Sequence, residues 1–144
     1  MRSRTKCAIA ALVVISAMLA IPSAQSLPAG ISGVQQSGCN CHGAVPSDSV
    51  VASIDGLPES YNYSETYDIT VSFQGGPSQE GNVNQGGFHL WASQGSLGVN
   101  DATAQLYNEN EVGHTEAGND QVAWTLTWTA PATDTNVDFI LHVN

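Results

Sequence analysis

A repeated alternation of apolar and polar residues, with a period of two, constrains the fold of this chain most. It is clearest over residues 66–73 and 122–129. The apolar members are Tyr67, Ile69, Val71 and Phe73 in the first segment and Val122, Trp124, Leu126 and Trp128 in the second. Successive side chains of a strand point to opposite faces, so each segment is predicted to be a β-strand with one buried face.

The same alternation appears over residues 137–143, and more weakly over 50–54 and 88–92. The residues expected to face inward are Val50, Ala52, Ile54, Phe88, Leu90, Ala92, Val137, Phe139, Leu141 and Val143. Glycine-rich turns separate the segments, and none has a convincing helical period. The pattern predicts an all-β, immunoglobulin-like antiparallel β-sandwich. By the same alternation, His89 and His142 are expected at the surface or an edge, and Trp91 is expected to be partly exposed.

The N-terminus has the pattern of a secretory signal peptide. Three basic residues precede a short apolar run, and small polar residues follow it. We expect a signal peptide at 1–24, with an uncleaved signal anchor as the alternative, then a flexible arm at 25–49 and one sandwich domain at 50–144. The chain stops directly after a strand pattern, so we expect a C-terminal truncation that hides any anchor. The location predicted is secreted or cell-surface anchored.

The charge of the chain is strongly one-sided. All three Lys and Arg residues lie in the leader, so the remainder carries 0 − 13 = −13 from Asp and Glu. Nucleic acids and anionic membranes are bound through Lys and Arg, so no nucleic-acid partner and no direct binding to anionic membranes are expected. The acids are scattered and form no calcium-loop motif, which favours a solvated acidic surface.

The segment Cys39-Asn40-Cys41-His42-Gly43 carries the local chemistry of the chain. Its second half matches the haem c attachment motif C-x-x-C-H, but the spacer here is one residue. Three interpretations stay open. Haem c could attach through the cysteines with His42 on the iron; Cys39, Cys41 and His42 could bind Cu or Zn; or the cysteines could form a disulfide or stay as thiols with no cofactor.

A haem iron would also need a sixth ligand or remain five-coordinate. No methionine follows Met18, so the candidate ligands are His89, His114 and His142. Of these, His114 is the metal-ligand candidate, although a hydrogen bond from its imidazole to the backbone is the favoured alternative. It is expected in a loop before the tryptophan-rich strand. Asn62 begins an N-x-S sequon and is predicted to be a glycosylation site.

Several stretches together resemble the Reeler-like surface domains described as having a variable C-terminal anchor. The matching residues are 38–43, Leu57-Pro58, Tyr61, 66–71, 87–92, Gly113-His114-Thr115 and 124–132. The resemblance implies an immunoglobulin-type sandwich exported to the cell surface, with a haem c motif before the first strand in many bacterial members. Two departures are Tyr63-Ser64, where Pro-Gly is usual, and the shortened cysteine spacer.

No enzymatic motif is present, so no catalytic residues and no enzymatic activity are predicted. The chain lacks a nucleophile elbow, a phosphate-binding loop and a zinc-protease helix. The predicted function is a cell-surface module whose cysteine segment binds haem c for extracellular electron transfer. The alternative is a non-catalytic adhesion or interaction module with a disulfide or a Cu or Zn site. Its partner would be an unidentified protein or redox protein.

Overall fold

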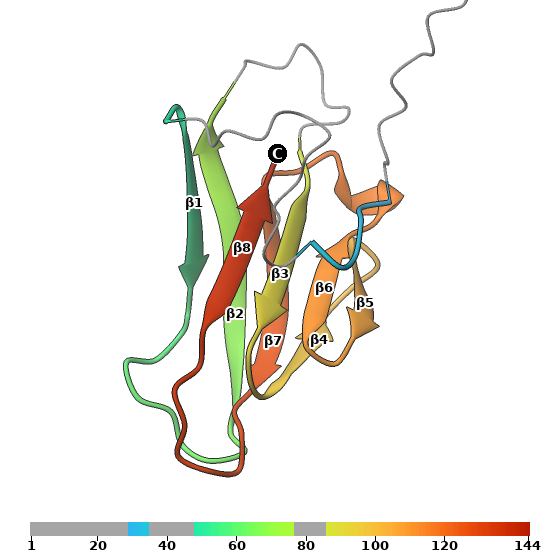
Figure 1. Ribbon diagram of the computed structural model, residues 1–144. Helices are drawn as coiled ribbons and strands as arrows, with labels where there is room; N and C mark the ends of the chain where they lie inside the picture. Colours follow the sequence, from blue (N-terminus) through green and yellow to red (C-terminus); the bar gives the residue numbers. More distant parts are fainter. Residues whose placement is uncertain (1–28, 35–47, 77–85) are drawn as a thin grey trace, which may run out of the picture.

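Two antiparallel sheets make up the described part of the molecule (Figure 1). The computed structural model describes residues 29–34, 48–76 and 86–144. Its elements are β1 (Val50–Asp55), β2 (Thr66–Gly75), β3 (Phe88–Ala92), β4 (Ser96–Val99), β5 (Ala104–Asn108), β6 (Glu111–His114), the 3-10 helix η1 (Glu116–Gly118), β7 (Ala123–Thr129) and β8 (Phe139–Val143). The strand orders are β1-β2-β7-β4 and β5-β6-β3-β8.

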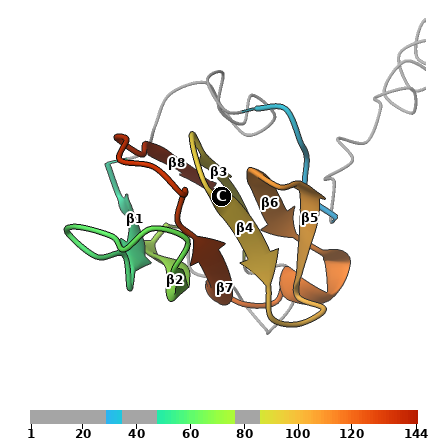
Figure 2. The same cartoon turned by 90° about the horizontal axis from the view of Figure 1, so that it is seen from below.

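The two sheets face each other as layers, as the view along the strands shows (Figure 2). The chain changes sheet at every connection except β1–β2 and β5–β6. Only β2 and β7 form a long central pair, in a register that sets Ile69 opposite Leu126 and Val71 opposite Trp124. These apolar residues therefore share one face. The antiparallel β-sandwich predicted from the sequence is confirmed.

The core lies between the sheets and is formed by both inner faces. Its buried apolar residues are Ile69, Val71, Phe73, Phe88, Leu90, Ala92, Leu97, Ala104, Val112, Trp124, Leu126, Trp128 and Ala130. Both buried indoles have a hydrogen-bond partner, because Trp124 Nε1 donates to Gly118 O at 3.0 Å and Trp128 Nε1 to Gln94 O at 3.1 Å. Large aromatic rings are thus buried without an unpaired N–H group.

Some sequence expectations were wrong at strand ends and edges. Val122 is 40% exposed because β7 begins only at Ala123. Ala52 is exposed because β1 is an edge strand and packs only partly on the core. His114 ends β6 and does not lie in a loop. The inward positions predicted over residues 137–143 are correct, since Val137, Phe139, Leu141 and Val143 pack against the core.

Candidate functional site

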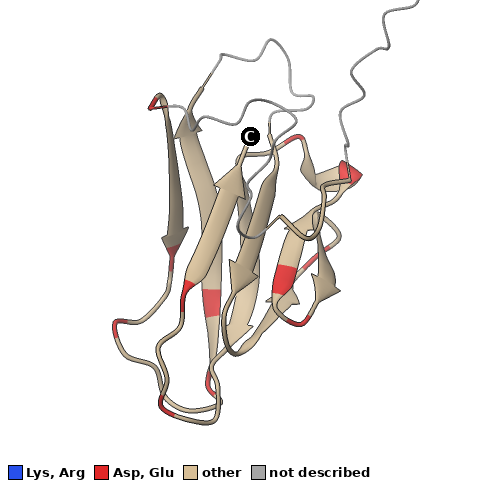
Figure 3. Cartoon of the chain, viewed as in Figure 1, with Lys and Arg blue, Asp and Glu red and all other residues tan. Residues whose placement is uncertain are grey.

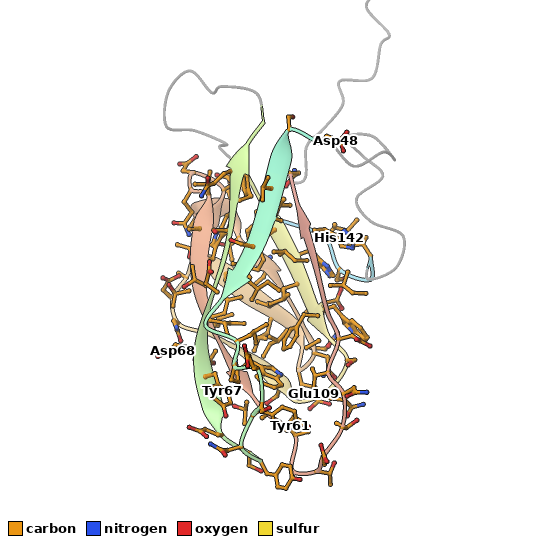
Figure 4. The ribbon with its side chains drawn as sticks, turned by 90° about the vertical axis from the view of Figure 1, so that its left-hand side faces the viewer. Asp48, Tyr61, Tyr67, Asp68, Glu109 and His142 are labelled. Carbon is orange, nitrogen blue, oxygen red and sulfur yellow. The ribbon has the colours of Figure 1, made fainter. Side chains whose placement is uncertain are left out.

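Four side chains form a polar cluster on the outer face of the second sheet. We call His89, Tyr107, Glu111 and His142 the outer-face cluster. His89 lies opposite His142 in the β3–β8 register, and their ring centroids are 6.0 Å apart. On the other side, the Tyr107 ring stacks on His89 at 6.4 Å and 21°. Four strands thus contribute to one row, with His142 on the outside of β8 (Figure 4).

A glycine makes room for this arrangement. Gly113 lies opposite His89 on β6, where a side chain would project from the outer face. A Cβ at this position would lie 2.8 Å from the hydroxyl oxygen of Tyr107 and 3.2 Å from Phe88 O. Real Cβ atoms do not approach a hydroxyl oxygen so closely, and glycine therefore allows the Tyr107 ring to reach His89.

Residues 29–34 cover the outer-face cluster. They run along the outer side of the second sheet, as the blue segment in Figures 1 and 2 shows. Ala29 O accepts hydrogen bonds from Gln105 Nε2 and from the Tyr107 hydroxyl, and the Gly33 N–H donates to Glu111 Oε1. His89 is consequently only 2% exposed and Glu111 3%. The expectation that His89 lies at the surface is wrong, because a distant segment covers its face of the sheet.

Glu111 is the negative centre of the outer-face cluster. Its Oε1 lies 2.7 Å from His89 Nε2, and its Oε2 accepts a hydrogen bond from Asn108 Nδ2 at 2.9 Å. Burial alone would raise the pKa of the Glu111 carboxyl. The hydrogen bonds from His89, Gly33 and Asn108, together with the charge of His89, outweigh burial and lower that pKa below its ordinary value. Glu111 is therefore ionised at neutral pH.

The same environment affects the two rings beside Glu111. Burial, followed by the negative charge of Glu111, raises the pKa of Tyr107 above its ordinary value, against a hydrogen bond involving Gln105. Tyr107 is therefore a neutral phenol.

The two ring nitrogens of His89 differ. In contrast to Nε2, the Nδ1 atom of His89 is buried and has no hydrogen-bond partner. It is the one buried side-chain nitrogen or oxygen without a partner in the described part of the chain.

His114 occupies a different environment, on the inner face of the sheet. Its Nδ1 lies 3.1 Å from both the amide nitrogen and the carbonyl oxygen of Phe88, and its ring is 6.5 Å from that of Trp124. Hydrogen bonding to the backbone, the favoured alternative for this residue, is therefore present. Its ligation of a metal stays a prediction, and the contact with Phe88 engages one of its two ring nitrogens.

The predicted cofactor residues Cys39, Cys41 and His42 lie outside the described residues. Their chemistry stays a prediction. Over residues 29–34, 48–76 and 86–144, no group of three or more His, Cys, Asp or Glu residues is arranged to hold a metal ion. The described residues thus offer no complete set of protein ligands for a metal.

A second candidate site is an open pocket at the end of the sandwich where the β1–β2 and β7–β8 connections meet. We call it the end pocket; its volume is about 800 Å³. Its aromatic lining residues are Tyr61, Tyr63, Trp128 and Phe139, and its acidic ones are Glu59, Asp134 and Asp138. The aromatic rings pack on one another, with Tyr61 edge-on to Trp128 at 5.7 Å and Phe139 edge-on to it at 5.2 Å.

Hydrogen bonds hold the two walls of the end pocket together. The Tyr61 hydroxyl donates to Thr135 O at 2.8 Å and accepts from Thr135 N at 3.0 Å. Tyr67 stacks on Trp128 and accepts a hydrogen bond from the backbone N–H of Asn62 at 2.8 Å. Tyr61 and Tyr67 lie at this end of the molecule in Figure 4. The side chain of Asn62, the predicted glycosylation site, is exposed and lines the pocket.

The chemistry of the end pocket suits a cationic group. Carboxylates and aromatic rings line it together, and the described residues contain no Lys or Arg to neutralise the carboxylates (Figure 3). Aromatic faces and carboxylates both attract ammonium and guanidinium groups. The sequence analysis missed this site, since its two walls lie about 70 positions apart. The only local signal was the spacing of Glu59, Tyr61 and Tyr63 in one turn-rich segment.

Comparison with known proteins places the fold. No family model and no curated protein matches the chain. Among solved structures, one fragment of the human F-spondin reeler domain is similar, with a TM-score of 0.50 and 18% identity over 77% of this chain and 84% of that one. The fold is Reeler-like.

Two further structures are similar at lower TM-scores. The Reelin-N domain of F-spondin has a TM-score of 0.47 and 21% identity, covering 65% of this chain and 70% of that one. A second fragment of the human F-spondin reeler domain has a TM-score of 0.47 and 18% identity, covering 67% and 78%. At such low identities, the similarity to these reeler domains describes the fold alone. Separately, the described residues contain no helix that is long and apolar enough to cross a membrane.

Proposed function

We propose that this protein is an exported, non-catalytic interaction module that binds a positively charged segment of a partner protein in the end pocket. The observation that carries the proposal is that aromatic and acidic side chains together line one preformed pocket of about 800 Å³. The signal peptide pattern and the Reeler-like fold support a place outside the cell, either secreted or anchored to the surface.

The end pocket is arranged before any partner arrives. The two hydrogen bonds between Tyr61 and Thr135 join its walls, and Trp128 is buried beneath. Binding to a preformed pocket orders fewer side chains, so less of the interaction energy is lost. Tyr63 is 59% exposed and offers a ring face to a lysine or arginine side chain. Such a cation–π contact contributes about 0.5–1 kcal/mol at exposed sites.

Carboxylates of the rim set the sign of the partner. Glu59, Asp134 and Asp138 are exposed, and none has a Lys or Arg neighbour in the part of the chain that is described. Their combined field attracts a basic segment and repels an acidic one, which increases the association rate and selects among partners. A glycan on Asn62 would stand at the same rim, so modification there would compete with the partner.

Binding of an oligolysine peptide tests the proposal. Fluorescence anisotropy would compare the wild-type chain with Asp134→Asn/Asp138→Asn, with Tyr63→Ala, and with Glu116→Gln as a control. Glu116 is exposed on η1, in the β6–β7 connection at the opposite end of the sandwich. Two exposed charge pairs contribute about 0.4–2 kcal/mol together, so the double variant should bind roughly 2- to 30-fold more weakly.

The controls decide whether the oligolysine peptide binds in the end pocket. Glu116→Gln should leave the affinity within twofold of wild type, and an oligoglutamate peptide should not bind. Tyr63→Ala should weaken binding about two- to fivefold, through loss of the exposed ring. Equal binding by the control and the double variant, or no oligolysine binding by the wild-type chain, would contradict the proposal.

Haem c attachment is the finer function that the segment Cys39-Asn40-Cys41-His42 predicts, and electron transfer would follow from it. What supports it is the thiol followed directly by a histidine in the sequence. The secreted protein, isolated from a host that matures cytochromes c, should then show a Soret band that survives acid-acetone extraction. An intact mass two hydrogens low would instead indicate a disulfide, and stoichiometric Cu or Zn would indicate a metal site.

A further inference from the structure

The unpartnered nitrogen of His89 is the least explained feature of the outer-face cluster. The ring is 2% exposed, its Nε2 is bound to Glu111, and its Nδ1 has no hydrogen-bond partner. Buried polar atoms in native proteins are almost always satisfied, and an exception points to a strained group, a water or an ion. The protonation of the ring decides whether Nδ1 can bind a water or a metal ion.

Glu111 fixes the tautomer of His89. A carboxylate oxygen of Glu111 lies 2.7 Å from Nε2, and a carboxylate oxygen accepts hydrogen bonds, so Nε2 is the nitrogen that donates its proton to Glu111. In the neutral imidazole the lone pair is then on Nδ1. A carboxylate that binds one nitrogen of a histidine while the other nitrogen ligates a metal is the common arrangement around zinc, and it increases the basicity of the ligand. His89 and Glu111 already form the carboxylate–histidine pair of this arrangement.

His142 supplies a second imidazole at a suitable separation. It lies directly across from His89 on β8, with its ring centroid 6.0 Å away. Metal–nitrogen bonds of about 2.0–2.1 Å place the centroid of each ligating ring about 3.2 Å from the ion, so two ligating rings can lie up to about 6.4 Å apart. The χ2 torsion of histidine is broad, so the partly buried His142 ring can turn toward an ion on His89 Nδ1 with its backbone unmoved, while Glu111 holds the His89 ring.

We propose that His89, through Nδ1, and His142 bind a divalent late transition metal ion, with Cu²⁺ preferred over Zn²⁺. Imidazole nitrogens suit these ions, and Cu²⁺ has the highest affinity in the first-row series. Ca²⁺ and Mg²⁺ are not expected, because they prefer oxygen ligands. Since the described residues place no third ligand with the two histidines, water completes the coordination and leaves positions open. The surrounding negative charge of the surface attracts the cation.

A variant without the predicted ligands of the arm separates this site from any chemistry of the cysteine segment. In the chain carrying Cys39→Ser, Cys41→Ser and His42→Ala, Cu²⁺ would be titrated as its glycine complex and followed by calorimetry and electron paramagnetic resonance. We expect one Cu²⁺ per chain, with hyperfine coupling to two nitrogens. The outcome does not depend on whether the end pocket binds a cationic partner, or on whether haem attaches to the wild-type cysteines.

Substitution of His142 is the decisive variant, since this residue is only partly buried and its loss should leave the sandwich folded. In the background that lacks Cys39, Cys41 and His42, His142→Phe should weaken Cu²⁺ binding at least tenfold and leave one coupled nitrogen. Ile140→Val, two residues away on β8, is the matched control and should bind like the background. Glu111→Gln should weaken binding about 10- to 100-fold. A folded His142→Phe chain with unchanged affinity would overturn the proposal, as would a background chain that binds no Cu²⁺, in which case Nδ1 holds a buried water only.

Discussion

Separate and joint replacement of His89 and Glu111 tests whether they form a buried, mutually dependent pair. The variants are His89→Phe, Glu111→Leu and the double replacement, in a metal-free buffer at pH 7. The side chains are 2% and 3% exposed and 2.7 Å apart, so each compensates the other for the water contacts that it loses on burial. Removal of one partner leaves an unpaired polar or charged group inside the protein, which typically costs about 3–5 kcal/mol of unfolding free energy.

The other contacts of Glu111 change this estimate little. Gly33 and Asn108 both donate to its carboxylate, but both residues are exposed and their donors return to water. Each such bond contributes about 0.5–1.5 kcal/mol net. Apolar residues of similar volume in place of a whole buried pair are often neutral or stabilising. The double variant should therefore be at least about 3 kcal/mol more stable than the sum of the two single effects implies.

Urea denaturation followed by tryptophan fluorescence measures these free energies, because Trp124 and Trp128 lie in the core. For a domain of this size, 1 kcal/mol corresponds to about 4–8 °C in Tm, so the single variants should melt roughly 12–40 °C below wild type. If a single variant fails to fold, the double variant still discriminates, since it should fold. Strictly additive effects, or single losses below about 1 kcal/mol, would refute the pairing.

Three further predictions concern pH, a close backbone approach and the end pocket. The folded-state pKa of Glu111 is lowered, so its contribution to the free energy of unfolding is present above the ordinary pKa of about 4.3 and is lost as pH falls through the folded value. Glu111→Gln should therefore flatten the acid side of a curve of stability against pH. An unchanged acid side would contradict this. A Cβ on Gly118 would lie 1.9 Å from Thr103 O, a backbone atom, so Gly118→Ala should cost about 1–3 kcal/mol in thermal unfolding, whereas a neutral effect would disprove the close approach. Tyr61→Phe removes the acceptor of the Thr135 N–H, so hydrogen exchange at that amide should become faster; equal protection would argue against joined pocket walls.

The long strands could be predicted from the sequence, because burial against one layer imposes a period of two over seven to ten residues. β2 and β7 show this directly. The strands β4, β5 and β6 could not be predicted, since they are only four or five residues long and, unlike β3 and β8, none of them has three alternating apolar residues. Gly98 and Gly113 interrupt two of them. His114 was consequently expected in a loop, although it ends a strand.

The candidate sites were harder to predict than the fold. Alternation correctly sets His89 on the outer face, but it gives no sign of what covers that face. The cover comes from residues 29–34, more than 50 positions earlier, and the ion-pair partner Glu111 lies 22 positions later. The end pocket likewise depends on two distant loops. Local pattern therefore predicts which side of a sheet a residue occupies, whereas burial and partners depend on contacts that only the folded chain shows.

The one-sided charge of the described surface also affects how the protein meets proteases and reagents. Beyond Lys6 the sequence has no Lys or Arg, so the sandwich offers no peptide bond to trypsin-like enzymes and no ε-amine to acylating reagents. Such a domain would resist digestion by trypsin-like proteases. Peptide mapping would need cleavage at acidic or aromatic residues, and amine labelling would be confined to the N-terminus of a processed chain.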